Sequence, residues 1–269
     1  MYLADYHVHS QNSADARFPM LDMAEAGLAA GLNEICFTDH VEPMLDDRVE
    51  HMKFDWPACA GEFEALRETM GDKLQLRLGA ELGDVFLDLP YLDELMAQAP
   101  PLDFLIGSNH MLSEKYRWAP LDRFRPADER EAQKAVEDYL TVEKRMVQWG
   151  RFDVLGHLTL PLRYFNERLG FHATFDGLED RMEEILRLVV EKGLGIEVNT
   201  NRGGQSLPDE KWLRMYRGLG GEIVTLGSDA HTPQFVGCAL RENQALLRRC
   251  GFTRFCTFDQ RRPIWHDLP

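Results

Sequence analysis

The stretch GLNEICFTDHVE, residues 31–42, contains the pattern that decides the fold. Gly31 stands where a helix is expected to end, because glycine readily adopts the left-handed backbone of a helix C-cap. Residues 34–39 form a short, largely apolar run with the length of a buried strand. That run ends in the polar residues Thr38, Asp39 and His40. The stretch therefore predicts a helix end, a strand, and chemically competent side chains at the end of the strand.

The same order of elements repeats along the chain. Strands are expected at 3–8, 34–39, 75–82, 103–108, 153–157, 195–200 and 222–228, and helices near 20–30, 56–70, 90–98, 128–149, 176–192, 208–218 and 238–249. Strands that alternate with helices predict parallel βαβ units. Seven such units favour a closed, TIM-like α/β barrel as a single domain over residues 1–269. The alternative is an open doubly wound sheet, but no GxGxxG motif follows an early strand.

Length, charge and cysteine content limit the classes of function. The 269 residues carry a net charge of −15, which disfavours nucleic-acid binding. A small phosphorylated substrate stays compatible with this charge, because bound metal ions can reverse its sign locally. No apolar run approaches the ~20 residues of a membrane span, and the N-terminus lacks a signal-peptide pattern. The five cysteines include no CxxC pair, so we expect reduced thiols in a cytoplasmic protein.

Polar or metal-competent residues end all seven expected strands. The active site of an α/β barrel lies at these carboxyl ends. A single histidine near an apolar run is usually structural, but that explanation fits poorly when it must hold for six histidines at the same end of the strands. We therefore predict a metal site there, and we expect loop or surface positions for His51, His172 and His266. The six strand-end histidines are His7, His9, His40, His110, His157 and His231.

The donor atoms indicate the type of metal centre. Imidazoles and carboxylates without thiolates suit zinc, iron or manganese. Six imidazoles exceed the roughly four ligands of one tetrahedral ion, so two or three divalent ions and a bridging carboxylate are expected. Glu81, Asp229 and Asp15 are the candidate carboxylates. Clustered ions lower the pKa of a bound water towards ~7, which predicts hydrolysis, most often of phosphate esters.

Six motifs together resemble the PHP (polymerase and histidinol phosphatase) superfamily. In order they are DYHVHSQNSADA, ICFTDH, GAELG, IGSNH, VLGHL and LGSDAH, and the resemblance extends from residue 5 to about residue 237. It implies a distorted (β/α)7 barrel with three metal ions. It further implies that the first ion is held by His7, His9, Glu81 and Asp229, the second by Glu81, His110 and His157, and the third by Asp15, His40 and His231.

Longer stretches are most similar to the histidinol-phosphate phosphatase branch of this superfamily. These stretches are GLNEICFTDHVE, DVLGHLTLPLRY, IEVNTNR and LGSDAHTPQFVG, and the branch also uses aspartate at the position of Asp15. The resemblance implies hydrolysis of L-histidinol phosphate in histidine biosynthesis. We expect a hydroxide that bridges two ions to attack phosphorus directly. The alternatives are a PHP phosphoesterase for another small phosphomonoester or nucleotide, and a metal-binding scaffold without catalysis.

Several further residues are candidates for contact with the reacting groups. Arg163 and Arg202 are expected to pair with the phosphate, the alternative being ion pairs at the barrel rim. Glu42, Asp84 and Asn199 are candidates for binding the amine or the imidazole of the substrate. Glu81, Asp229 and His231 are the expected catalytic residues, and Asp229 or His231 is the candidate proton donor to the leaving group, although metal binding occupies both.

Two features outside the ligand set have two interpretations each. Asp5 shares a strand face with His7 and His9, so it is either a residue of the barrel interior or one that orients an imidazole. Segment 111–127 is either a lid or rim over the pocket or an ordinary surface loop.

Overall fold

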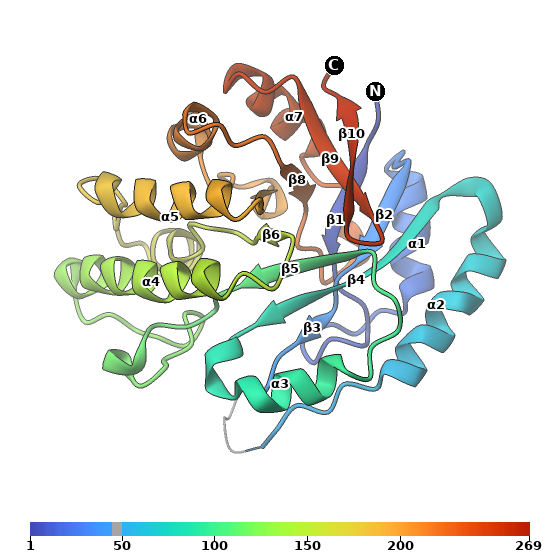
Figure 1. The fold of residues 1–269 in the computed structure, drawn as a ribbon, viewed down its shortest axis with the longest axis horizontal. Helices are drawn as coiled ribbons and strands as arrows, with labels where there is room; N and C mark the ends of the chain where they lie inside the picture. Colours follow the sequence, from blue (N-terminus) through green and yellow to red (C-terminus); the bar gives the residue numbers. More distant parts are fainter. Residues whose placement is uncertain (45–49) are drawn as a thin grey trace.

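The main sheet is parallel and nearly closed into a barrel. The computed structural model describes residues 1–44 and 50–269. Neighbouring strands follow the order β1, β2, β4, β5, β6, β7, β8, and β3 pairs with β4 beyond the end of β2 (Figure 1). This arrangement confirms the predicted distorted barrel. The strands are β1 Ala4–Val8, β2 Glu34–Phe37, β3 His40–Val41, β4 Gln75–Gly83, β5 Phe104–Ser108, β6 Val154–Leu155, β7 Gly195–Asn199, β8 Val224–Gly227, β9 Arg254–Asp259 and β10 Arg262–Asp267.

The segment after β8 returns to β1 at the carboxyl end of the barrel. The Asp229 N–H donates to the His7 carbonyl at 2.8 Å, and the His9 N–H donates to the Ala230 carbonyl at 2.9 Å. Asp5 supports this closure, because its carboxylate accepts from both the backbone N–H and the hydroxyl of Ser228, at 2.8 and 2.6 Å. Asp5 is therefore a barrel-interior residue that joins the first and last strands, the first of its two interpretations.

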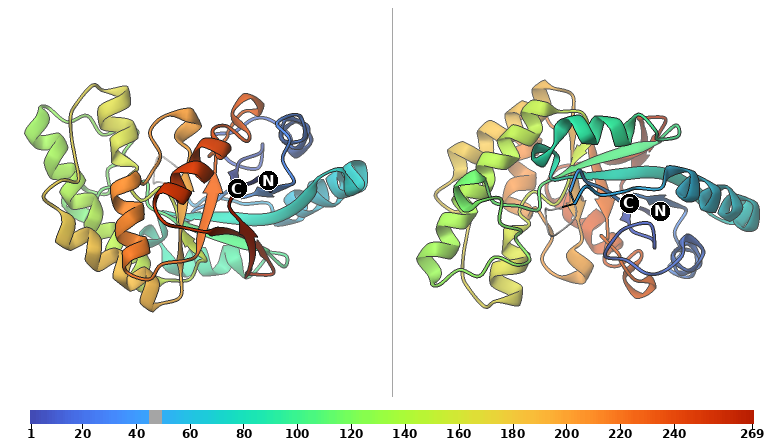
Figure 2. Two further views of the ribbon diagram at one scale, coloured as in Figure 1. Left: turned by 90° about the horizontal axis from the view of Figure 1, so that it is seen from above. Right: turned by 90° about the horizontal axis from the view of Figure 1, so that it is seen from below.

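Helices surround the strands on the outside of the barrel (Figure 2). Gly31, the helix end predicted from the sequence, follows α1 with a φ of 79°. Gly150 likewise ends α4, with a φ of 62°. None of the helices within the described residues has the length and apolar composition that a membrane crossing requires. The helices are α1 Met20–Ala29, α2 Trp56–Met70, α3 Leu89–Met96, α4 Glu129–Trp149, α5 Glu179–Glu191, α6 Glu210–Gly218 and α7 Leu240–Arg249.

The antiparallel hairpin of β9 and β10 covers the amino end of the barrel, and no element was expected there. Tyr6 points from β1 to this hairpin, where its hydroxyl donates to the Phe258 carbonyl at 3.0 Å and accepts from the Phe258 N–H at 2.9 Å. The Phe258 ring lies 4.9 Å from that of Phe104. Tyr2 stacks on His266 at 3.9 Å, so the two ends of the chain lie side by side (Figure 1).

Candidate metal centre

A cavity of about 630 Å³ opens at the carboxyl end of the barrel. The ends of β1, β4, β5, β6 and β8, the short strand β3 and the loop after β1 deliver the predicted ligands to it. His7, His9 and Glu81 are almost fully buried and lie beneath the cavity wall. The other six predicted ligands line the cavity itself: Asp15, His40, His110, His157, Asp229 and His231.

Glu81 on β4 lies at the centre of this cluster and is only 1% exposed. Its Oε1 lies 3.0 Å from His157 Nε2, and its Oε2 lies 3.2 Å from His7 Nε2 and 2.9 Å from His40 Nδ1. Burial alone would raise the pKa of Glu81, but the charges of His7, His40 and His110 outweigh burial and hold the pKa well below its usual value. Glu81 is therefore an anionic carboxylate in contact with several imidazoles, as a bridging ligand must be.

Several buried ligand atoms in the cluster lie close to one another but make no hydrogen bond of acceptable geometry among the described residues. They include His7 Nε2, His9 Nε2 and Glu81 Oε2. Leaving a buried polar atom unpaired costs free energy, so such atoms need another partner. The Nε2 atoms of His110 and His157 face each other at 3.3 Å, an arrangement that a shared cation stabilises. This donor set fits divalent metal ions, as the ligand chemistry predicted.

Among the described residues, four groups of three ligand atoms are each close enough to hold one ion. Two of them correspond to the first and second predicted ion sites. The third predicted site is also brought together, because Asp15 Oδ2 lies 2.9 Å from His231 Nε2 and Asp15 Oδ1 lies 3.7 Å from His40 Nε2. The groups are His7, His9 and Asp229; Glu81, His110 and His157; His9, His40 and His231; and His40, Glu42 and His110.

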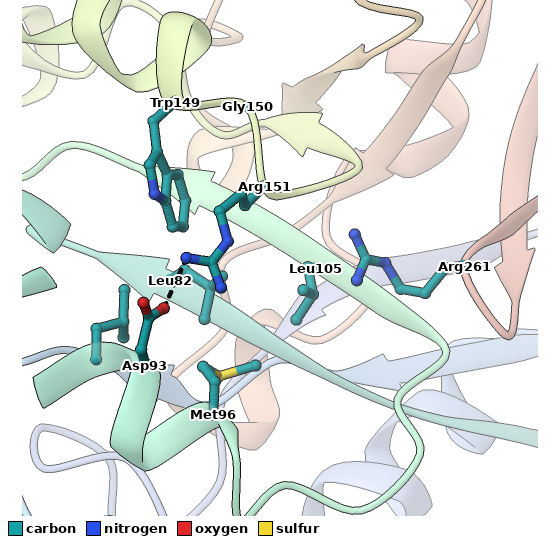
Figure 3. A pocket seen from close by; sticks show the side chains of 9 residues that line it. Leu82, Asp93, Met96, Leu105, Trp149, Gly150, Arg151 and Arg261 are labelled. Carbon is teal, nitrogen blue, oxygen red and sulfur yellow. Dashed lines mark hydrogen bonds and ion pairs between the residues drawn. The ribbon is translucent and has the colours of Figure 1, made fainter. Parts of the chain in front are cut away.

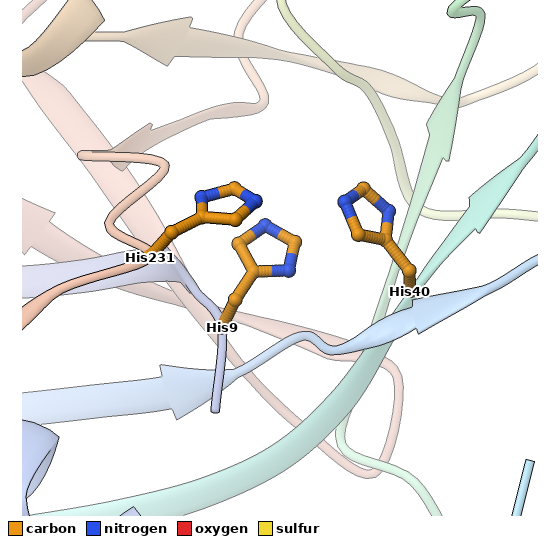
Figure 4. A group of neighbouring side chains, drawn as sticks. All are labelled: His9, His40 and His231. Atoms are coloured by element: carbon orange, nitrogen blue, oxygen red, sulfur yellow. The ribbon is translucent and has the colours of Figure 1, made fainter. Parts of the chain in front are cut away.

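The group of His9, His40 and His231 adds a residue to the expected third site. Figure 4 shows the three imidazoles converging from the end of β1, from β3 and from the segment after β8. The rings of His9 and His231 are 4.0 Å apart. Burial, together with the charges of His231 and His40, holds the pKa of His9 well below its usual value. A neutral imidazole is the form that binds metals, so His9 can serve either of two neighbouring ions.

Glu197, in the middle of β7, orients two ligands and was missed by the sequence analysis. Its Oε1 lies 2.6 Å from His7 Nδ1, and its Oε2 accepts from the His157 N–H at 2.8 Å. A carboxylate on the Nδ1 side of an imidazole fixes the tautomer that leaves Nε2 for a metal. The available signal was an acidic residue within the apolar run IEVN, which has no place in a buried strand without a partner.

Ser13 and Asp39 orient His9 in a similar way. The Ser13 hydroxyl donates to Asp39 Oδ1 at 2.7 Å and lies 3.1 Å from His9 Nδ1. It also accepts from the His40 N–H at 3.0 Å. One hydroxyl therefore positions ligands from two strands, and this role was also absent from the sequence-based prediction.

Arg163 is buried against Asp229. Its Nη1 donates to Asp229 Oδ2 at 2.5 Å, its Nε donates to Asn201 Oδ1 at 2.6 Å, and its Nη2 donates to Asn199 Oδ1 at 2.9 Å. Burial raises the pKa of Asp229, but Arg163 and the neighbouring imidazoles hold it well below its usual value. The expected substrate contact of Asn199 needs correction, because Asn199 is fully buried and its side chain is engaged by Arg163. Asn199 holds Arg163 in place.

The remaining predicted contacts lie on the cavity wall. Arg202 Nη2 lies 3.2 Å from His231 Nδ1. Glu42 Oε1 lies 3.1 Å from His110 Nδ1, and Asp84 Oδ1 accepts from the His110 N–H at 3.0 Å. Glu42 and Asp84 therefore contact a predicted ligand directly, which the sequence did not indicate.

Segment 111–127 contributes to the rim of the cavity. Met111, Pro120, Asp122 and Arg123 all line it, so the lid-or-rim interpretation describes this segment better than that of an ordinary surface loop. The short helical turn Glu114–Tyr116 lies within the segment.

The histidines expected at surface or loop positions are not among the residues that line the cavity. His51 pairs with Asp88 at 2.9 Å, and the largely exposed His172 pairs with Glu129 at 3.1 Å. His266 lies on β10 in the hairpin at the other end of the barrel.

A second cavity of about 330 Å³ has different chemistry (Figure 3). Its wall contains Leu82, Leu105 and Trp149, and an ion pair of 2.6 Å joins Asp93 to Arg151 across it. None of the four groups of potential metal ligands among the described residues includes a residue of this wall. The metal chemistry is therefore confined to the first cavity in the part of the chain that the structure describes.

Comparison with known proteins identifies the family. Residues 5–201, more than half of the chain, match the model of the PHP domain family. The chain belongs to the PHP family. The histidinol-phosphatase of Lactococcus lactis subsp. lactis is 28% identical to this PHP protein over 94% of the chain and 93% of the relative. A probable histidinol-phosphatase of Thermotoga maritima is also 28% identical, over 93% of each protein.

A solved structure resembles this PHP protein over its whole length. It is the histidinol phosphate phosphatase of Lactococcus lactis subsp. lactis, complexed with zinc, L-histidinol and phosphate. The TM-score is 0.79 at 25% sequence identity, with 97% of this chain and 98% of the other covered. The likeness therefore extends over nearly the whole chain.

Proposed function

We propose that this PHP protein hydrolyses L-histidinol phosphate to L-histidinol and phosphate, as a step of histidine biosynthesis in the cytoplasm. One observation carries the proposal: a cluster of imidazoles and carboxylates with unpartnered donor atoms lies at the base of a cavity large enough for a small phosphate ester. The relative that shares this fold over its full length was solved with zinc, L-histidinol and phosphate. All five cysteines are free, which agrees with a reducing compartment.

The proposed centre holds two or three ions of zinc, manganese or iron. When bound, such ions supply an activated water and neutralise charge on the phosphoryl oxygens. His7, His9, Glu81 and Asp229 would hold the first ion, Glu81, His110 and His157 the second, and Asp15, His40 and His231 the third. Glu81 is suited to bridging because it remains anionic among the imidazoles.

The protein groups would position the ester within the cavity. Arg163 makes three hydrogen bonds within the protein, and a guanidinium has five N–H donors. The two remaining N–H groups are available to phosphate oxygens, and we assign Arg202 on the cavity wall as the second phosphate contact. Asp229 and His231 lie at the reacting end of the cavity, with Glu81 buried beneath it. His231 is the candidate proton donor to the leaving oxygen, because Arg163 keeps Asp229 ionised.

A phosphate-release assay tests the proposed function. Purified protein with Mn²⁺ or Zn²⁺ is expected to hydrolyse L-histidinol phosphate far faster than nucleotides or generic phosphomonoesters, and a chelator should abolish the release. Equal and slow rates on all these esters would contradict the proposed substrate.

Metal content tests the site separately from activity. His40→Ala is expected to lower the metal content by about one ion per chain, since His40 is a proposed ligand of the third ion. His172→Ala is the matched control, because this histidine is largely exposed and lies outside the cavity. Unchanged metal content in His40→Ala would refute this ligand assignment.

A further inference from the structure

The cavity has two chemically different parts. The proposed metal ligands and Arg163 occupy its base. The rest of the wall combines apolar and charged side chains, and its charged groups include Asp84, Asp122, Arg123 and Arg168. Arg168 packs over the Tyr164 ring at 4.6 Å. A phosphate ester bound at the base would place its leaving group against this outer wall, whose apolar members are Met44, Met52, Met111, Pro120, Leu160 and Tyr164.

Among the residues that the structure describes, five carboxylates line the cavity, and four of them have close polar contacts within the protein. Asp15 lies 2.9 Å from His231 Nε2, and Glu42 lies 3.1 Å from His110 Nδ1. Asp84 accepts from the His110 N–H at 3.0 Å, and Asp229 accepts from Arg163 at 2.5 Å. Each of these charges is therefore already compensated by an imidazole, a backbone N–H or a guanidinium.

Asp122 differs from the other four. The nearest cationic atom to its carboxylate among the described residues is Arg123 Nε at 3.9 Å, which is beyond hydrogen-bond distance. Its side chain is about half exposed, at 48%, on the rim segment. A carboxylate on a cavity wall without a hydrogen-bonding partner is available to a cationic ligand group.

We propose that Asp122 is a specificity-determining residue that binds the ammonium group of the substrate's leaving alcohol. This assignment rests on the proposed function, since L-histidinol phosphate carries a primary ammonium group close to the ester. Asp122 then accounts for a preference for amino-alcohol phosphates over uncharged esters. The apolar wall would contact the carbon body and the imidazole of the same leaving group.

The test compares two substrates with Asp122→Asn, which keeps the shape of the side chain and removes its charge. The substrates are L-histidinol phosphate and the analogue in which hydrogen replaces the amino group. The variant is expected to raise KM for L-histidinol phosphate roughly two- to fivefold, as for a lost ion pair at a partly exposed site. The KM for the deamino analogue and kcat for both esters are expected to remain unchanged.

Asp72→Asn is the charge-matched control, because Asp72 is exposed and precedes β4 at the opposite end of the barrel. It should leave both KM values unchanged. Equal KM changes for the two esters in Asp122→Asn, or no change in either, would overturn the assignment of Asp122 while the proposed function stands. Failure of the wild-type protein to hydrolyse L-histidinol phosphate would instead overturn the proposed function, and the assignment with it.

Discussion

At the scale of single residues, two buried glutamates organise the cluster of imidazoles. Glu81 contacts imidazoles from three other strands, and Glu197 contacts His7 and the backbone of His157 from the opposite side. Glu197 thus joins one proposed ligand of the first ion to one of the second. Glu197, which contacts the proposed ligands from the side away from the ions, therefore determines the geometry of the site as much as the ligands do.

Glu197→Gln should weaken metal binding by about 10- to 100-fold, because an amide is a weaker acceptor for the His7 Nδ1–H than a carboxylate. Metal affinity would be measured by competition with a chromophoric chelator. Glu191→Gln, an exposed position at the end of α5, serves as the control. Equal affinities of the wild type and Glu197→Gln would contradict the orienting role.

At the scale of elements, α4 contains an acidic group that is buried in the protein interior. Glu143 is fully buried, and neither of its oxygens has a hydrogen-bond partner among the described residues. Burial raises the pKa of Glu143 to about 8, although Tyr139 one turn earlier lowers it in part. Glu143 is therefore protonated in the folded protein at neutral pH, whereas an unfolded glutamate with a pKa of about 4.3 is ionised.

The stability of the protein should consequently depend on Glu143 between pH 4.5 and 8. The contribution of Glu143 to the free energy of unfolding is fully present below the pKa of the unfolded state. It is lost as the pH rises to and through the pKa of Glu143 in the folded protein. Glu143→Gln mimics the neutral acid, so its Tm should exceed that of the wild type by about 10 °C at pH 8.5 and match it near pH 4.5. Thermal unfolding at both pH values, with the exposed Glu137→Gln as the control, tests this. A constant difference in Tm across the range would contradict it.

The elements also show what periodicity alone can predict. The seven main strands were predictable because each is a short apolar run between a helix end and a polar cluster. Most of the proposed metal ligands could be predicted as a group because they occupy the ends of those runs. By contrast, β3 has two residues and exists through its pairing with β4, and the hairpin of β9 and β10 depends on packing against Tyr6 and Phe104. Such contacts between distant segments leave no local period in the sequence.

The roles of the groups around the proposed ligands could not be predicted from local sequence patterns either. Asn199 was interpreted as a substrate contact because it lies at a strand end, but the side chain of Arg163 lies on it. Glu197 and Ser13 acquire their roles through partners 190 and 4 residues away in the chain. Position along a strand thus predicts the end of the barrel to which a side chain belongs, whereas the partner depends on the packed structure.

At the scale of the whole molecule, the two ends of the barrel differ in access. The amino end is covered by the C-terminal hairpin, with Tyr6 hydrogen-bonded to Phe258 and Phe258 packed on Phe104. The interior between the two ends is filled by side chains, as in other α/β barrels. The cavity at the carboxyl end therefore has its opening on one side of the molecule.

Because the amino end is covered, the active-site cavity is open at one end only. Substrate must therefore enter, and both products must leave, through the same opening. The product that is bound more deeply is released last. Phosphate is bound at the base of the cavity under the proposed function. Inorganic phosphate should therefore compete with the ester for the active site of the free enzyme. Initial rates at several phosphate concentrations should show a raised KM with unchanged kcat, and a lowered kcat at constant KM would show that phosphate acts elsewhere.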